Sequence, residues 1–451
     1  MALFVAGVAL AGLAGAGTSK TQAGLGTIFL VTKFDDTFDG FCDFDDCSLR
    51  EAVAQANSTE AADQVRLPAG TYTLSLGPDS CADNTNSCGD LNVGQDLTVQ
   101  GAGPGVTVID ANDVDRIFTI EENGETIVDV EITGVTMRDG FSETSVGGAL
   151  SVSRQTAVIL TETAFVSNEA AIFGGAIYVS LEGSLSITDS TLNANRSNHS
   201  GGALGNRGTL SISNSTISGN VTRVTGGGLW RLGPGTSTTV TNTTIAGNRA
   251  GSGGAGIAAP GYSAEPLRIR ESALSNVGPD CSGYLVSHGL NISDDSSCNL
   301  VHLGDRPATE PLLAPLADNG GLTKTRTLLP GSPAIDMVPP EFCASSRDQR
   351  GMPRPSRGRC DPGAVEVGFC FGLRETRVGT EFSEALVGTT EADVIFGLDG
   401  DDAITARGGD DAICGDSGAD SLDGGLGTND RRNGGPGSDT DQACERRLNI
   451  P

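Results

Sequence analysis

The sequence predicts an all-β protein: a right-handed, single-stranded parallel β-helix with capping segments, followed by a small parallel β-roll. Two internal repeats predict this fold, one of about 27 residues in the middle of the chain and one of nine residues near its end. No segment carries a helical period long enough for helices to cover a parallel sheet. The 64 glycines and the aromatic content of only 4% agree with many tight turns around a core of aliphatic side chains.

The longer repeat is marked by glycine pairs that begin at residues 147, 174, 201, 226 and 253, in steps of 27, 27, 25 and 27 residues. Short alternating segments such as LSIT and LSIS lie between the pairs and are typical of strands. Coils of a parallel β-helix pair about 4.8 Å apart, so equivalent residues stack along the axis. We therefore expect an asparagine ladder in one turn, formed by Asn168, Asn195, Asn220, Asn248 and Asn276. We also expect an internal apolar stack of Phe165, Leu192, Ile217, Ile245 and Leu274.

The repeats and their flanks divide the chain into predicted segments. These are a signal peptide or apolar leader (1–24), an N-terminal cap with the first coil (25–90), the β-helix (91–300), a C-terminal cap (301–368), a linker (369–387) and the roll (388–445). In the N-terminal cap, residues 47–57 read CSLREAVAQAN, with Ser48 and Glu51 spaced as a capping box. This segment predicts a short amphipathic helix whose apolar face covers the first coil and protects its edge.

The first residues predict export. Residues 2–17 form an uninterrupted apolar run, which is too short to span a membrane and is followed by small residues, as in a signal peptide. No Lys or Arg precedes the run, which leaves open whether Met1 is the true start. We expect a secreted or cell-surface protein with no membrane span in the mature chain.

The 11 cysteines also favour an oxidising compartment, because most fall into close pairs without histidine partners. The close pairs are Cys42/Cys47, Cys81/Cys88, Cys281/Cys298, Cys343/Cys360 and Cys414/Cys444. We predict disulfides Cys81–Cys88, Cys281–Cys298 and Cys343–Cys360, with Cys414–Cys444 as a further candidate and Cys370 left over. The alternative is a set of reduced thiols in a cytosolic protein.

Two motifs carry a resemblance to known bacterial families. CSLREAVAQAN is similar to the CSLREA segment that opens many surface β-helix proteins. The stretch from ADNGGLTKTRTLLPGSPAID (317–336) through DQRGMPRP (348–355) to CDPGAVE (360–366) resembles the choice-of-anchor-Q region. Together these resemblances span about 40–370, and they imply export and surface display but no reaction.

Near the C-terminus the period becomes nine. Asp393, Asp402, Asp411 and Asp420 are nine residues apart, and an Ile or Leu follows each by two positions. The pattern resembles the repeat-in-toxin (RTX, hemolysin-type) nonapeptide GGxGxDxUx, where U is a large apolar residue. The resemblance implies a parallel β-roll with two nonapeptides per coil, in which glycine carbonyls and aspartate carboxylates of loops two repeats apart hold Ca²⁺.

On this resemblance the predicted calcium ligands are Asp393, Asp402, Asp411, Asp420, Asp430 and Asp439, with two to four working sites. Three loops depart from the pattern. GTTEAD (388–393) lacks the second glycine, ARGGDD (406–411) reads as shifted, and GGLGTND (424–430) gains one residue, so that Asn429 or Asp430 is the ligand. Residues 388–451 hold 14 Asp/Glu and 5 Lys/Arg, a charge that a divalent cation would offset. The alternative is a disordered acidic tail, which would not need an aliphatic residue every nine positions.

Some polar residues of the repeat could instead serve an enzyme. One column of turn residues holds Glu162, Asp189, Asn214, Asn242 and Glu271. Glu162 and Asp189 on adjacent coils are expected about 5 Å apart, a retaining-glycosidase spacing. Polar stacking is the preferred explanation, because the repeat itself generates the column and most of it is amide. Arg196 and Arg249 are read as exposed coil residues, and His199, His288 and His302 show no metal-ligand spacing. Trp230 with Tyr178 forms either a sugar-stacking platform or simple packing.

The net charge of −28 argues against nucleic acid or an anionic membrane as partner. The sequence therefore predicts a secreted or cell-surface calcium-binding β-helix protein, non-enzymatic, with Ca²⁺ as its cofactor and an extracellular glycan or a host or neighbouring cell surface as partner. No catalytic residue is assigned. The alternative is a secreted polysaccharide lyase or glycoside hydrolase on a pectate-lyase-like β-helix.

Overall fold

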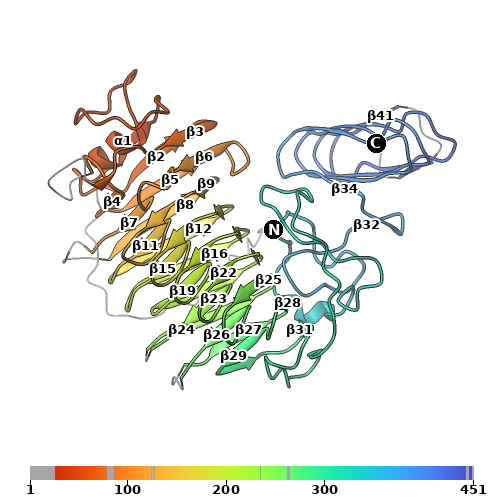
Figure 1. Ribbon diagram of the computed structural model, residues 1–451. Coiled ribbons are helices and arrows are strands. Elements are labelled where there is room, and N and C mark those ends of the chain that lie inside the picture. The colour runs from red at the N-terminus through yellow and green to blue at the C-terminus, as the bar shows by residue number, and fades with distance from the viewer. Residues whose placement is uncertain are drawn as a thin grey trace, which may run out of the picture.

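A computed structural model describes residues 26–78, 86–122, 124, 127–233, 235–261, 265–442 and 446–448 (Figure 1). Parallel coils stack from the red and orange N-terminal end to the green end, and the blue C-terminal roll is a separate stack of flat coils. The predicted leader lies outside the described residues. None of the described helices is long and apolar enough to cross a membrane.

Within the described residues, three parallel sheets form the walls of the β-helix. Sheet 1 has ten strands: β1 (Ile28–Leu30), β2 (Asp63–Leu67), β5 (Leu97–Gly101), β8 (Val128–Thr133), β12 (Thr156–Thr161), β16 (Ser184–Thr188), β20 (Thr209–Ser213), β24 (Ser237–Thr241), β27 (Leu267–Arg270) and β30 (Leu285–Ser287). Sheet 3 has eight: β4 (Leu91–Val93), β7 (Phe118–Ile120), β11 (Leu150–Val152), β15 (Ile177–Val179), β19 (Leu204–Asn206), β23 (Leu229–Arg231), β26 (Ile257–Ala259) and β29 (Cys281–Gly283).

Sheet 2 is the largest of the three, with 13 strands in the described part of the chain. They are β3 (Gly70–Thr73), β6 (Thr107–Asp110), β9 (Thr136–Arg138), β10 (Phe141–Ser142), β13 (Ala164–Val166), β14 (Glu169–Ala170), β17 (Thr191–Asn193), β18 (Arg196–Ser197), β21 (Thr216–Ser218), β22 (Val221–Thr222), β25 (Thr244–Ala250), β28 (Ala273–Val277) and β31 (Ile292–Ser293). Parallel pairing begins at β1 and β2, within the segment 25–90 that was expected to hold the N-terminal cap and the first coil.

The register of sheet 2 confirms both predicted stacks. Phe165 pairs with Leu192, Leu192 with Ile217, Ile217 with Ile245 and Ile245 with Leu274, and each of these side chains is fully buried. The asparagines form the expected ladder: each amide Nδ2 donates to the Oδ1 of the next asparagine at 2.9 Å, from Asn168 through to Asn276. The backbone N–H of each asparagine donates to the same oxygen, so the amide column satisfies its own polar groups.

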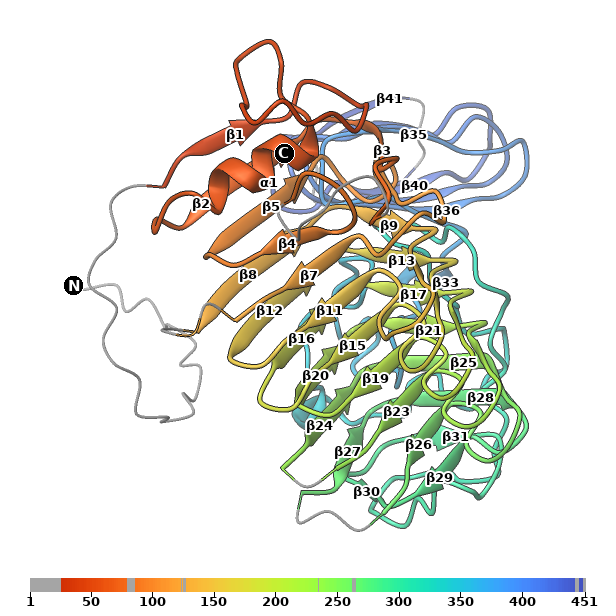
Figure 2. The ribbon, with the colours of Figure 1, turned by 60° about the vertical axis from the view of Figure 1, so that its left-hand side comes forward.

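The N-terminal end is covered by α1 (Leu49–Ala56), which lies across the first coil beside β2 and β4 (Figure 2). Ser48 and Glu51 form the predicted capping box. Leu49, Ala52, Val53 and Ala56 are buried and join the core of the β-helix, so this helical face was predicted correctly.

At the other end the Cys281–Cys298 disulfide joins β29 to the loop that follows β31. Residues 311–367, which we call the return segment, then run back along the side of sheet 2. Ala344 N donates to Glu271 Oε2, Thr323 Oγ1 donates to Asp189 O, and Gln349 bonds to Thr191. This segment, which belongs to the region expected as a C-terminal cap (301–368), is held by these hydrogen bonds and by a buried apolar cluster that joins Leu328 and Met337 to Ile292.

The roll has two parallel sheets. One contains β34 (Arg377–Val378), β36 (Val394–Asp399), β38 (Ala412–Ser417), β40 (Arg431–Asn433) and β42 (Arg446–Leu448), and the other β35 (Ala385–Val387), β37 (Ala403–Thr405), β39 (Ser421–Asp423) and β41 (Thr440–Gln442). The short hairpin β32 (Phe369–Cys370) and β33 (Leu373–Arg374) precedes it. The predicted apolar positions Ile395, Ile404, Ile413 and Leu422 are the buried core between the sheets.

The disulfides agree only in part with the pairing predicted from sequence. Cys281–Cys298 and Cys343–Cys360 are confirmed, and Cys42 is bonded to Cys47. Cys88 is disulfide-bonded, while its expected partner Cys81 lies outside the described residues. The candidate pair Cys414–Cys444 is wrong and Cys370 is not left over, because Cys370 is bonded to Cys414. Cys414 lies on β38, which packs against β32, so the fold of the roll brings together two cysteines 44 positions apart.

Breaking the asparagine ladder should destabilise the β-helix. In Asn195→Ala, the backbone N–H and side-chain amide of Asn168, the main-chain carbonyl of Phe165 and Oδ1 of Asn220 each lose a buried partner, which we expect to cost about 3 kcal/mol. Thermal unfolding followed by circular dichroism should show a clearly lower midpoint. Asn198→Ala is the matched control, since that amide makes only a 3.4 Å contact with Glu169 Oε1, and equal losses in both variants would contradict the ladder's role.

Candidate metal centre

The aspartates of the nonapeptides lie at the ends of the glycine-rich loops, immediately before the strands of the roll. They form two rows. The first row contains Asp393, Asp411 and Asp430 and precedes one sheet, while the second contains Asp402, Asp420 and Asp439 and precedes the other. The structure thus brings the six predicted residues together as two stacks of three.

Within each row, one carboxylate oxygen accepts a hydrogen bond from the backbone N–H of the aspartate in the preceding coil. Asp402 N donates to Asp420 Oδ1 at 2.9 Å and Asp420 N to Asp439 Oδ1 at 3.0 Å. In the first row, Asp393 N donates to Asp411 Oδ1 at 2.7 Å and Asp411 N to Asp430 Oδ1 at 2.8 Å. These bonds fix each carboxylate at the loop and leave its other oxygen to be satisfied separately.

That other oxygen is buried without a hydrogen-bond partner among the described residues at Asp402, Asp411, Asp420 and Asp439. In the second row it faces a glycine. A Cβ added to Gly397 would lie 2.6 Å from Asp402 Oδ2 and 2.6 Å from the carbonyl oxygen of Gly415. A Cβ on Gly415 would lie 2.3 Å from Asp420 Oδ2 and 2.8 Å from Gly434 O. Each loop therefore presents a carboxylate and a main-chain carbonyl to a space that no side chain can enter, and these oxygens are the donors that Ca²⁺ prefers.

The loop backbone explains one departure from the pattern. Leu398, Arg407 and Asp416 have left-handed backbones, with φ of 82°, 76° and 65°, at the position where later loops carry Gly425 and Gly435. Arg407 in ARGGDD therefore occupies the second-glycine position, and the expectation that this loop is shifted was wrong. Its register is the same as that of its neighbours, with Ala406 and Arg407 in place of the first two glycines.

The other two departures have different consequences. In GTTEAD, Thr389 donates from both its N–H and its hydroxyl to Asp393 Oδ2, and Thr376 Oγ1 donates to Oδ1, so the protein itself satisfies this carboxylate. In GGLGTND the extra residue is absorbed within the loop, and Asp430 rather than Asn429 takes the row position.

Burial makes these carboxylates costly to ionise. It raises the pKa of Asp402 to about 6, with Asp420, Glu384 and Asp401 adding repulsion. Burial and the neighbouring carboxylates raise the pKa of Asp411 and of Asp420 in the same way. A cation among these groups would reverse the sign of the electrostatic interaction.

The expected acidic column also forms a distinct site. Glu162, Asp189, Asn214, Asn242 and Glu271 all have left-handed backbones, with φ between 43° and 52°. Glu162 and Asp189 line a cavity of about 260 Å³, together with Arg347 and Arg350 of the return segment and Glu381 of the roll. Nothing in the sequence predicted that Arg347, Arg350 and Glu381 would line the same cavity as the two acids. Both arginines are already paired, Arg347 with Asp399 and Arg350 with Asp348 and Glu375.

The pKa values of both acids that line this cavity are raised. Burial, followed by repulsion from Glu162, raises the pKa of Asp189 to about 7, and its Oδ1 is buried without a partner. Burial and Glu381 raise the pKa of Glu162.

The aromatic pair read as a sugar platform is buried. Trp230 is 4% exposed and Tyr178 is 8% exposed, and Phe173 stacks on Trp230 with ring centroids 4.4 Å apart. His199 meets the same Phe173 edge-on. Trp230 and Tyr178 therefore pack in the interior, stacked with Phe173, and do not form an exposed platform.

The C-terminal roll thus presents two rows of carboxylate oxygens, together with main-chain carbonyls, the donor atoms that hard cations prefer. Residues 378–430 match the family model described as the RTX calcium-binding nonapeptide repeat, in overlapping matches over 378–413, 387–422 and 400–430. The chain therefore carries RTX calcium-binding repeats. No curated protein matches the sequence. Among solved structures the chain is similar to pectate lyase Pel9A, at 14% identity over 76% of this chain and 97% of that chain, with a TM-score of 0.38.

Asp189 should make stability depend on pH. Its folded pKa of about 7 lies above the ordinary value of about 3.9, so the native state keeps a proton that the unfolded chain releases. Its contribution to stability is therefore present at pH 4 and is lost as the pH rises towards 7. Asp189→Asn should be more stable than wild type by on the order of 2 kcal/mol at pH 8 and nearly equal to it at pH 4.5.

Thermal midpoints at the two pH values measure this effect. Glu131→Gln, which changes an exposed acid on sheet 1, is the control and should show no such pH-dependent gain. A difference between Asp189→Asn and wild type that is the same at both pH values would contradict the burial argument.

Proposed function

We propose that the two carboxylate rows are the calcium ligands of an exported, non-enzymatic β-helix protein that acts in adhesion or as an extracellular scaffold. The observation that carries the calcium part is the set of buried carboxylate oxygens at Asp402, Asp411, Asp420 and Asp439, each without a partner among the described residues. Three of these atoms, at Asp402, Asp420 and Asp439, recur at the coil spacing of 18 or 19 residues, and the fourth, at Asp411, lies in the other row. An unpaired buried oxygen costs free energy, and a bound cation would offset that cost.

The second row is the stronger candidate. Asp402, Asp420 and Asp439, with the carbonyls of Gly415 and Gly434, would hold ions between successive loops. In the first row, Asp411 and Asp430 would contribute, while Asp393 is already satisfied by its threonines. Bound Ca²⁺ would supply the positive charge that offsets these stacked carboxylates. The predicted number of two to four sites agrees with this division.

The calcium roll would be an integral part of the fold. Val378, Phe396 and Leu398 of the roll pack with Met352 of the return segment in one buried cluster. The Cys370–Cys414 disulfide and the Arg347–Asp399 ion pair, at 2.9 Å, add to this contact. A roll ordered by calcium would therefore also stabilise the return segment against the side of the β-helix.

Export and surface display are supported by the disulfides, the acidic net charge of −28 and the CSLREA-like and choice-of-anchor-Q-like motifs. A polysaccharide-degrading enzyme is the second candidate, because Glu162 and Asp189 share a cavity and Asp189 has a pKa suited to a general acid. The non-enzymatic role is preferred, since the cavity is narrow and both of its arginines are already paired with carboxylates.

Calcium should protect the roll from proteolysis in the full-length protein. In calcium, trypsin should spare Arg407 and Arg431, and in excess chelator it should cleave there while the β-helix remains intact. Asp420→Asn should weaken calcium binding about tenfold or more, because it removes the central charge of the second row. Isothermal calorimetry measures the affinity and the number of ions.

Glu391→Gln is the matched control for this experiment. Its carboxylate lies exposed on a loop of the same roll, and the change removes the same charge without touching either row. Equal trypsin resistance in calcium and in chelator, or no heat of binding at millimolar calcium, would contradict the ligand assignment.

The surface role and its enzymatic alternative can be separated with polysaccharides. A glycan array probed with the calcium-loaded protein should give binding, while incubation with uronate polymers should give neither unsaturated products nor new reducing ends. Turnover by wild type that is lost in Glu162→Gln and in Asp189→Asn would reject the non-enzymatic role in favour of a lyase or hydrolase.

A further inference from the structure

We propose a second binding site, for a small organic anion with an apolar body, at the end of the β-helix opposite α1. A cavity of about 610 Å³ opens there, a size that suits a ligand of this kind. It lies between the last coil, the loop that follows β31 and the 3₁₀ turn η2 (Pro340–Phe342). Its principal polar and aromatic lining residues are Arg270, His288, His302, Arg306, Phe342 and Arg359.

The charge of this cavity is opposite to that of the molecule. The chain has a net charge of −28, yet the described residues that line the cavity include three arginines, two histidines and a single carboxylate. That carboxylate, Asp305, accepts four hydrogen bonds, from Ser287, from the backbone and side chain of Asn291 and from His302 N. Asp305 is therefore used to build the wall, and the remaining field favours an anion.

Two of the three arginines are not paired with a carboxylate of the described residues. Arg270 is paired with Glu271 at 2.7 Å, but Arg306 and Arg359 form no ion pair with any described residue. Both are nevertheless held in place by main-chain carbonyls. Arg359 donates from Nε to Asp336 O and from Nη2 to Met337 O, each at 2.6 Å, and Arg306 donates from Nη1 to Pro333 O. A guanidinium oriented by neutral acceptors retains both its charge and free N–H donors for a carboxylate or sulfonate.

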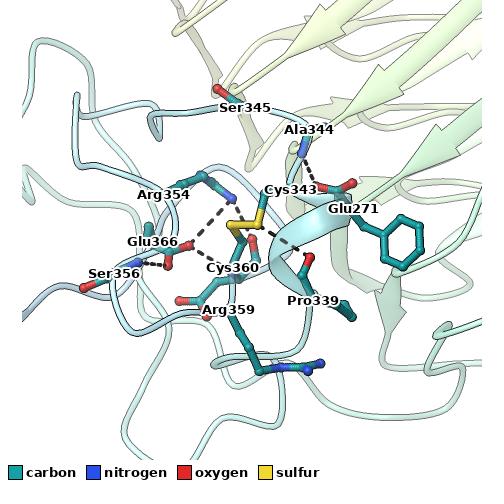
Figure 3. Close-up of a disulfide and its surroundings, with 12 residues drawn as sticks. Glu271, Pro339, Cys343, Ala344, Ser345, Arg354, Ser356, Arg359, Cys360 and Glu366 are labelled. Atoms are coloured by element: carbon teal, nitrogen blue, oxygen red, sulfur yellow. Dashed lines mark hydrogen bonds and ion pairs between the residues drawn. A yellow bond between two sulfur atoms is a disulfide. The ribbon is translucent and has the colours of Figure 1, made fainter.

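The rest of the wall is apolar and rigid. Phe342, which is 44% exposed, Leu290, Met337 and Pro339 provide the surface that an apolar ligand body would cover. The Cys343–Cys360 disulfide, shown beside Arg359 in Figure 3, joins the residue after Phe342 to the residue after Arg359. One covalent bond therefore ties together the two chain segments that carry the aromatic wall and the cation. Such fixed geometry reduces the entropy lost on binding.

The probe for this site is 8-anilinonaphthalene-1-sulfonate, an aromatic anion whose fluorescence rises on binding, titrated into the calcium-loaded full-length protein. We expect saturable binding with one site per chain. Arg359→Gln and Arg306→Gln should each weaken it about tenfold, the usual effect of losing one charge-assisted contact. Arg359→Lys should keep most of the affinity because it keeps the charge.

Two controls make the result specific. Arg249→Gln removes an exposed arginine of β25 that does not line the cavity and should leave binding unchanged. The neutral analogue N-phenyl-1-naphthylamine should bind wild type and the arginine variants equally, whereas Phe342→Ala should weaken both probes. Circular dichroism confirms that each variant is folded. Unsaturable binding of the anion, or equal affinity for wild type and both glutamine variants, would overturn the proposal.

Discussion

Parallel pairing of each coil with the next is the interaction on which the rest of this structure depends. Because the register is kept from β5 to β27, a residue at one position has its own counterpart directly above and below it. The side chain at each position must therefore pack against, or hydrogen-bond to, the equivalent side chains of the neighbouring coils. Apolar residues meet this condition by packing, and one continuous column of the core is formed by Phe165, Leu192, Ile217, Ile245 and Leu274.

The same condition separates amides from carboxylates. An asparagine carries both donors and an acceptor, so the column from Asn168 to Asn276 is satisfied within itself, each amide donating to the next. An ionised aspartate only accepts. In the roll, backbone N–H groups satisfy one oxygen of each aspartate in a row, and the second oxygen of Asp402 and of Asp420 remains buried and unpaired. A stacked carboxylate column therefore needs a proton or a cation, and the pKa of about 6 for Asp402 expresses that need.

Sequence periodicity predicted what repeats and missed what does not. The two stacks of the β-helix, the capping box of α1 and the buried aliphatic positions of the roll follow from spacing alone, because stacking turns sequence period into spatial contact. The Cys370–Cys414 bond was missed because sequence proximity favoured Cys444, whereas the fold brings β32 against β38. The register of ARGGDD was misread because Arg407 adopts the left-handed backbone usually left to glycine. The two aspartate rows needed only the nine-residue period, but the satisfaction of Asp393 by Thr376 and Thr389 depends on contacts across the coil that spacing does not specify.

The return segment shows why function in such a protein is hardest to predict. Regular coils present the same column on every turn, and a repeated surface offers no unique pocket. Both cavities discussed above arise where non-repeating residues lie against repeating ones: Arg347 and Arg350 beside Glu162 and Asp189, and Phe342 and Arg359 beside the last coil. No periodicity marks these residues. Hydrogen bonds from Gln349 to Ser190 O and from Ala344 N to Glu271 hold the segment that carries them against the repeating coils. In this fold the repeats supply a regular surface. Sites that can bind one ligand in preference to another arise where non-repeating chain lies against that surface.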